Sequence, residues 1–214
     1  MRVEIWSDFV CPWCYVGKRR FERALAARPN ADRVEIVHRA YLLYASLERG
    51  ASVDRRSMLM AKYRLTGDQA DAMNGNMVRT AAAEGLDYHL EGGLTGNTFD
   101  AHQLACLARN RGSQDAVVER LYRASFVEQR SIFERNAIVA LGVEAGLDAD
   151  DVSRALHADA YAATVEADVA EARAKGVTGV PFFVFDGRYA IAGAQALEVF
   201  DQALGEAEAS ELRA

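Results

Sequence analysis

The sequence of 214 residues is poor in cysteine and proline, with only three of each. Three cysteines are too few for a fold held by disulfides, and this usage fits a reducing compartment better. Positive charge is not in excess, since the net charge is -6, which argues against nucleic acid or an anionic membrane as a partner. No stretch approaches the roughly 20 apolar residues of a membrane span, and no secretory leader is recognisable. We therefore expect a cytoplasmic globular protein.

Two of the three cysteines form a close pair, Cys11 and Cys14, in a Cys-Pro-Trp-Cys sequence. The apolar pattern before the pair predicts a buried strand over residues 2–7, and a helical pattern follows to about residue 28. Pro12 suits the first turn of that helix. Free N–H groups and the helix dipole favour a thiolate at a helix N-terminus. The motif therefore predicts a redox-active dithiol in which Cys11 is the nucleophile and Cys14 the resolving thiol.

A metal site is the other common use of such a pair. Structural zinc normally needs a second close pair of ligands. Cys106 and the four histidines show no such spacing, so no metal is expected. Cys106 is expected to be buried and inert, because free cysteine packs like a small hydrophobic residue.

The order of the remaining predicted elements indicates a split α/β domain. A second strand over residues 34–38 would pair in parallel with the first through a right-handed crossover. Two strands around Asp186-Gly187 form a predicted hairpin, because this dipeptide is typical of tight turns. Gly193–Gln195 is predicted to open a final helix.

The segment between these strands is rich in Ala, Leu, Arg and Glu at helical spacing. Helices are predicted near residues 54–64, 67–84, 98–111, 113–125, 134–145, 148–156 and 159–175. Gly92–Gly96 is expected to be a loop. We therefore predict a discontinuous α/β domain of residues 1–45 and 161–214 that carries an all-helical insertion of residues 46–160.

Pro181 stands at the entrance of the first hairpin strand, in Gly-Val-Pro-Phe-Phe. Proline cannot donate to a sheet ladder, so it belongs at a strand start or a bend. Two interpretations stay open here: an ordinary start of an edge strand, or a cis Val180–Pro181 bond that faces the dithiol.

Taken together, the motifs resemble the DsbA-like thiol:disulfide oxidoreductases, and most closely their FrnE-type branch. This branch is also similar to 2-hydroxychromene-2-carboxylate isomerases and kappa-class glutathione transferases. The resemblance covers nearly the whole chain, through residues 7–17, 97–102, 176–185 and 187–195. It implies a thioredoxin fold with a large helical insertion, in which Val180 and cis-Pro181 pack beside the dithiol. The Val180 backbone would then pair with an extended substrate.

The resemblance implies a protein-disulfide oxidoreductase that works through a mixed disulfide on Cys11, which Cys14 resolves. It implies no metal and no bound organic cofactor, only an exchange partner or glutathione. The substrate would be a thiol- or disulfide-containing protein or small molecule, and the chain a monomer or homodimer. The alternative is a glutathione-dependent isomerase or transferase. Those relatives replace the first thiol with serine, so the intact pair favours redox exchange.

Three further candidates lie in or next to the Cys-Pro-Trp-Cys motif. Asp8 precedes Cys11 by three residues and is either a proton acceptor during exchange or a cap of its own loop. Trp13 and Pro12 are expected to border the site. The Pro12-Trp13 dipeptide lacks the histidine of strongly oxidising DsbA proteins, so we expect a Cys11 pKa lowered less than theirs.

Asn97 and His102 are candidates from the insertion. The resemblance would let both residues, together with Thr98, approach the dithiol. Alternatively, Asn97 or Thr98 caps a helix and His102 is a packed polar side chain.

Overall fold

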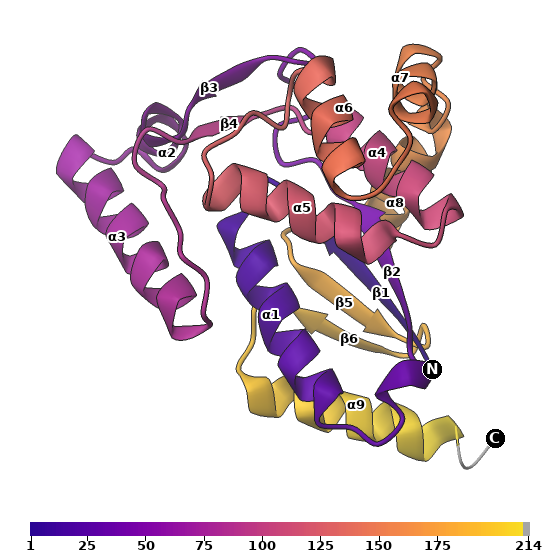
Figure 1. Ribbon diagram of the computed structural model, residues 1–214. Helices are drawn as coiled ribbons and strands as arrows, with labels where there is room; N and C mark the ends of the chain where they lie inside the picture. Colours follow the sequence, from indigo (N-terminus) through magenta and orange to yellow (C-terminus); the bar gives the residue numbers. More distant parts are fainter. Residues whose placement is uncertain (212–214) are drawn as a thin grey trace.

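The computed structural model describes residues 1–211, and four strands form its main sheet (Figure 1). These are β1 (Arg2–Ser7), β2 (Glu35–Ala40), β5 (Phe182–Phe185) and β6 (Tyr189–Ala192), in the order β2-β1-β5-β6. β1 pairs with β2 in parallel, whereas β5 is antiparallel to both β1 and β6. α1 (Pro12–Ala26) connects the parallel pair. The predicted α/β class with a helical insertion is confirmed.

Helices cover both faces of this sheet. Val3 and Ile5 of β1 lie in the apolar cluster formed with Phe21 of α1 and Phe200 of α9 (Leu197–Glu211). On the other face, α8 (Ala162–Ala174) packs against β2, and the Trp6 indole donates a hydrogen bond to the Asp168 carbonyl at 3.0 Å. The alternation of β1 therefore divides its side chains between two apolar layers.

The insertion consists of helices whose ends follow from local capping signals. Thr66 forms a capping box at the start of α3, and Asp148 accepts from a backbone N–H at the start of α7. Gly85, Gly112 and Gly146 have positive φ after α3, α4 and α6, as expected for C-terminal stops. The helices are α2 (Arg55–Tyr63), α3 (Gly67–Ala83), α4 (Phe99–Asn110), α5 (Gln114–Phe126), α6 (Arg135–Glu144) and α7 (Ala149–His157).

Two sequence expectations are wrong in detail. The predicted loop Gly92–Gly96 contains β4 (Leu94–Gly96), which pairs antiparallel with β3 (Ser52–Asp54). Strands of three residues are too short for an alternating pattern to show in the sequence. The final helix begins at Leu197 rather than at Gly193–Gln195, because Gly193 has φ +82° and these residues form a turn.

The insertion and the sheet domain share a core around the beginning of α1. Cys14 and Tyr15 belong to the same apolar cluster as the helices of the insertion. The Tyr15 ring stacks on Tyr122 of α5, with 4.9 Å between ring centroids. In Figure 1, α5 lies across the N-terminal end of α1. The Cys-Pro-Trp-Cys turn therefore lies at the junction of the sheet domain and the insertion. The domain boundaries at residues 46 and 160 remain predictions.

Within residues 1–211, none of the helices combines the length and apolarity that crossing a membrane requires. The same residues hold no group of three or more His, Cys, Asp or Glu side chains that could bind a metal ion.

Gly17 of α1 makes a close approach that a side chain would prevent. A Cβ at this position would lie 2.8 Å from Pro181 Cγ. We expect Gly17→Ala to destabilise the protein by about 1–3 kcal/mol, the usual cost of overpacking. Urea denaturation measures the change. Gly75→Ala in α3 is the matched control, because a Cβ there meets only Arg79 at 3.7 Å and should stabilise the helix by about 0.5–1 kcal/mol. Equal effects of the two substitutions would contradict this account.

Candidate active site

The two thiols lie at the N-terminal end of α1. Cys11 is the N-cap residue in an extended conformation, with no side-chain cap, and Pro12 occupies the first turn. Cys11 is 7 % exposed and Cys14 2 % exposed, and the two are not disulfide-bonded. Because no side chain caps the helix, its free N–H groups remain available to the sulfur of Cys11.

The surroundings move the pKa values of the two thiols in opposite directions. A hydrogen bond from the Cys14 thiol lowers the pKa of Cys11, against the opposing effect of burial. Burial raises the pKa of Cys14, and its interaction with Cys11 raises that pKa further. One thiolate shared by the pair therefore resides on Cys11, the more exposed sulfur. This is the arrangement that a nucleophile and a resolving thiol require.

Val180 and Pro181 lie beside Cys11, although about 170 residues separate them from it in the sequence. The Val180–Pro181 peptide bond is cis. The Cys11 sulfur lies 3.5 Å from the Val180 carbonyl oxygen. The Pro181 carbonyl accepts a hydrogen bond from Gly193 N–H at 2.8 Å, which ties this turn to the end of β6.

Asp8 is fully buried and connects three segments of the chain. Its carboxylate accepts hydrogen bonds from Val10 N–H at 3.3 Å, Leu43 N–H at 2.7 Å and the Thr98 hydroxyl at 2.7 Å. Burial raises the pKa of Asp8 to about 6, although these hydrogen bonds oppose the shift. A backbone hydrogen bond from Asp8 lowers the pKa of Cys14, but burial outweighs it. Asp8 therefore caps its own loop and is also a titratable group next to Cys14.

The predicted residues of the insertion divide between two environments. His102 lies next to Asp8, with its Nε2 4.0 Å from Oδ1, and burial lowers its pKa to about 3, so the ring is neutral. Thr98 meets Asp8 directly. Asn97 instead donates to the Leu47 carbonyl at 2.7 Å and accepts from Phe99 N–H at 2.9 Å. Its amide therefore caps α4 and holds the preceding loop, and has no contact with the thiols.

The turn between the two cysteines is held by a residue that the sequence did not reveal. Tyr88, from the segment after α3, donates a hydrogen bond to the Pro12 carbonyl at 2.7 Å. Its ring is buried and stacks at 6.1 Å on Tyr15. Trp13, in contrast, is 46 % exposed and lines the same cavity as Cys11.

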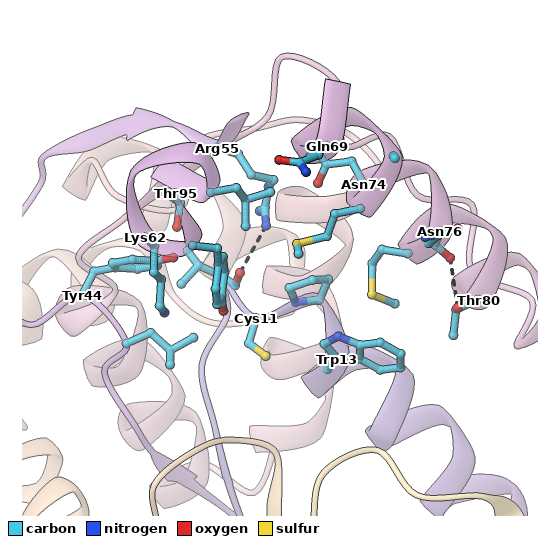
Figure 2. Close-up of a pocket in the computed structure, with 18 residues that line it drawn as sticks. Cys11, Trp13, Tyr44, Arg55, Lys62, Gln69, Asn74, Asn76, Thr80 and Thr95 are labelled. Carbon is cyan, nitrogen blue, oxygen red and sulfur yellow. Dashed lines mark hydrogen bonds between the residues drawn. The ribbon is translucent and has the colours of Figure 1, made fainter. Parts of the chain in front are cut away.

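A cavity of about 670 Å³ opens over Cys11 and Trp13, between the start of α1 and the α2–α3 pair. Arg55, the first residue of α2, is buried in its wall and donates to the Val10 carbonyl at 3.3 Å (Figure 2). No pattern marks this arginine in the sequence. The short β3–β4 pairing places it, together with the hydrogen bond from Arg55 N–H to the Gly93 carbonyl at 2.9 Å.

Two further sequence features remain, Cys106 and the turn at Gly193–Gln195. Cys106 is buried in α4, and burial raises its pKa to about 12, so it is an unreactive thiol. In the turn at Gly193–Gln195, the Ala194 carbonyl accepts a hydrogen bond from the Arg20 guanidinium at 2.8 Å.

The sheet order, the dithiol at the start of α1 and the cis-proline turn beside it define a thioredoxin-fold protein with a helical insertion. The chain belongs to the family described as the DSBA-like thioredoxin domain, whose family profile matches residues 2–205. This agrees with the family inferred from the motifs.

Solved structures with this fold include a probable DsbA oxidoreductase from Streptomyces coelicolor. It is 50 % identical, with a TM-score of 0.92 over 98 % of this chain and 90 % of that one. The cytosolic disulfide reductase DsbM from Pseudomonas aeruginosa is 20 % identical, with a TM-score of 0.67 over 100 % and 99 % of the chains. A 2-hydroxychromene-2-carboxylate isomerase is 16 % identical, with a TM-score of 0.71 over 100 % and 98 %. The last two show the shared fold alone.

The opposite pKa shifts of the dithiol can be tested by alkylation. We expect the faster-reacting thiol, Cys11, to react with iodoacetamide with a midpoint below about 8.5, the value of a free thiol. Cys14→Ala should raise this midpoint, because it removes the thiol hydrogen bond that lowers the Cys11 pKa. Cys106→Ala is the matched control and should leave the midpoint unchanged. A wild-type midpoint at or above the free-thiol value would refute the assignment.

Asp8 should make the stability of the fold depend on pH. Its folded-state pKa of about 6 lies above the ordinary 3.8, so the unfolded chain releases this proton at lower pH than the folded protein does. The wild type therefore loses stability as the pH rises through this interval. Relative to wild type, the free energy of unfolding of Asp8→Asn should rise by up to about 3 kcal/mol between about pH 4 and pH 7.

Urea denaturation across this pH range measures the difference. Asp54→Asn is the control whose difference from wild type should change little across this range, because a hydrogen bond from Ser57 N–H lowers the pKa of Asp54 from the ordinary 3.8. If the difference in unfolding free energy between wild type and Asp8→Asn does not change with pH, the pKa of Asp8 is not raised.

Proposed function

We propose that this protein is a thiol:disulfide oxidoreductase that works through Cys11 and Cys14 in a reducing, cytoplasmic environment. The observation that carries the proposal is the pair of opposite pKa shifts within one turn of α1. These shifts support a thiolate at the more accessible sulfur and a second thiol that stays protonated until it is needed. Membership of the DSBA-like family supports the same chemistry.

In the reducing direction, the Cys11 thiolate attacks one sulfur of a substrate disulfide. A mixed disulfide forms on Cys11, and the other substrate sulfur leaves as a thiolate. Cys14 then loses its proton and attacks the Cys11 sulfur, which releases the second substrate thiolate and leaves a Cys11–Cys14 disulfide. Two electrons pass from the dithiol to the substrate. Glutathione or another thiol returns the pair to the reduced state by the reverse steps.

The second step needs a proton acceptor, because burial raises the pKa of Cys14. Asp8 is the titratable group suited to this task. Its pKa of about 6 leaves the carboxylate ionised at neutral pH but basic enough to take a proton. The carbonyl and cis turn of Val180 and Pro181 border the sulfur where the substrate would lie, and an extended substrate can pair with that backbone.

The order of the two thiols gives the test. Reduced Cys14→Ser protein should form a stable mixed disulfide with oxidised glutathione, because the resolving thiol is missing. Cys11→Ser should form none, since burial holds the remaining thiol protonated. Mass spectrometry of the intact protein measures the adduct, and Cys106→Ser should behave as wild type. Adducts on Cys14 at an equal rate would overturn the assignment. Full turnover of a non-thiol substrate by Cys14→Ser would indicate a glutathione-dependent isomerase or transferase instead.

A further inference from the structure

The cavity over Cys11 has the dimensions and lining of a site for a small organic molecule. Its volume of about 670 Å³ falls in the range of ligand sites, which is about 300–1,000 Å³. Methionine side chains are flexible and polarisable, so a cavity wall that contains them can adapt to a ligand. Its apolar wall consists of Leu43, Leu59, Met73, Met77 and the ring of Trp13.

The charged residues of this wall are all of one sign. The lining includes Arg55 and Lys62 but no Asp or Glu, although the chain as a whole carries a net charge of -6. Figure 2 shows Arg55 above Cys11, with Lys62 and Tyr44 on one side and Trp13 on the other. The cavity is therefore a local positive region that opens on the nucleophilic sulfur.

Neither cation is neutralised within the described residues. Arg55 is 6 % exposed and donates to the backbone carbonyls of Val10 at 3.3 Å and Leu94 at 3.2 Å, while its Nε has no partner. The Lys62 ammonium lies over the Tyr44 ring at 5.0 Å and has no carboxylate within salt-bridge distance in residues 1–211. A buried guanidinium without a counterion is costly.

A second buried donor group lines the same wall. Thr95 is 2 % exposed, and its hydroxyl has no hydrogen-bond partner among the described residues. Burial also lowers the pKa of Arg55, and interaction with the Cys11 sulfur opposes this shift. Unsatisfied donors around a positive charge favour an anionic acceptor in the cavity.

We propose that this cavity binds a low-molecular-weight disulfide or thiol that carries a carboxylate on an apolar body. The carboxylate faces Arg55 and Lys62, the apolar body lies against the wall of leucine, methionine and tryptophan side chains, and the sulfur meets Cys11. The proposal rests on the thiol–disulfide exchange proposed above. Glutathione matches this lining less well, because the lining offers no carboxylate for the ammonium group of glutathione.

A carboxylate-bearing aryl disulfide, 5,5′-dithiobis(2-nitrobenzoate), is a suitable probe, and neutral 4,4′-dithiodipyridine is its control. The Cys11 thiolate attacks a sulfur of the probe and releases one arylthiolate. Deprotonated Cys14 then attacks Cys11, releases the second arylthiolate and leaves the Cys11–Cys14 disulfide. Each probe takes two electrons from one dithiol, so stopped-flow absorbance follows both reactions.

The measured quantity is the ratio of the rate constants for the charged and the neutral probe. Arg55→Met should lower this ratio at least about tenfold, the effect of losing one charge-assisted hydrogen bond. Arg55→Lys should restore part of it, and Lys62→Met should lower it less. Arg33→Met is the matched control, because it removes the same charge at the opposite end of the sheet, where Glu35 pairs with Arg2, and should leave the ratio unchanged.

Three outcomes would decide against the proposal. If Arg55→Met slows both probes equally, the arginine acts through the Cys11 thiolate and not on the substrate. If Lys62→Met and Arg55→Met leave the ratio at the wild-type value, the cavity does not recognise the carboxylate. If Arg33→Met changes the ratio as much as Arg55→Met does, the ratio depends on the net charge of the protein and not on recognition in the cavity.

A binding measurement keeps the proposal testable if the Arg55 or Lys62 variants do not fold. It also separates ligand binding in the cavity from thiol–disulfide exchange. 2-Naphthoate, an apolar carboxylate without sulfur, should bind the Cys11→Ser protein in calorimetry at least about tenfold more tightly than neutral 2-naphthamide. Equal affinity for the two overturns the binding proposal. Binding of 2-naphthoate with no reaction of either disulfide at Cys11 refutes the proposed function and leaves the cavity as an anion site.

Discussion

One buried carboxylate holds the active region together. Asp8 accepts hydrogen bonds from its own loop, from the segment after β2 and from the first turn region of α4, so three stretches distant in sequence meet at a single group. Such a group is expensive to bury unless its acceptors are filled. The position of the cysteine turn relative to the insertion therefore depends on these three bonds being made together.

The two thiols show how a short motif acquires two chemical roles from its surroundings. Cys11 caps a helix that no other side chain caps, whereas Cys14 lies one turn further in and is sealed under the insertion. Tyr88 fixes the peptide between them through the Pro12 carbonyl. Identical side chains thus become donor and acceptor of a hydrogen bond, and the direction of that bond lowers the pKa of Cys11 relative to that of Cys14.

Much of the fold could be predicted from the sequence, because the signals are local. Alternation in β1, Pro12 in the first turn of α1, and the glycines after α3, α4 and α6 each act within a few residues. The site was accessible only in part. The dithiol and Pro181 are visible as motifs, but Arg55 and Tyr88 carry no sequence signal. A three-residue strand pairing and a tertiary hydrogen bond place them, and neither leaves a periodicity to read. For Asn97 the sequence leaves two roles open, an approach to the dithiol and a cap of the helix, and only its tertiary position shows that its amide accepts from Phe99 N–H at the start of α4.

The shared core at the beginning of α1 has a consequence for how this architecture can change. Phe9, Tyr15 and Val16 are buried in one apolar cluster with the helices of the insertion. Removing the insertion would therefore expose apolar surface next to the thiols and leave the Asp8 carboxylate without its Thr98 partner. The helical insertion is therefore not a separate domain added to a sheet domain that could fold without it. The sheet and the insertion have to be inherited, truncated or engineered as one unit.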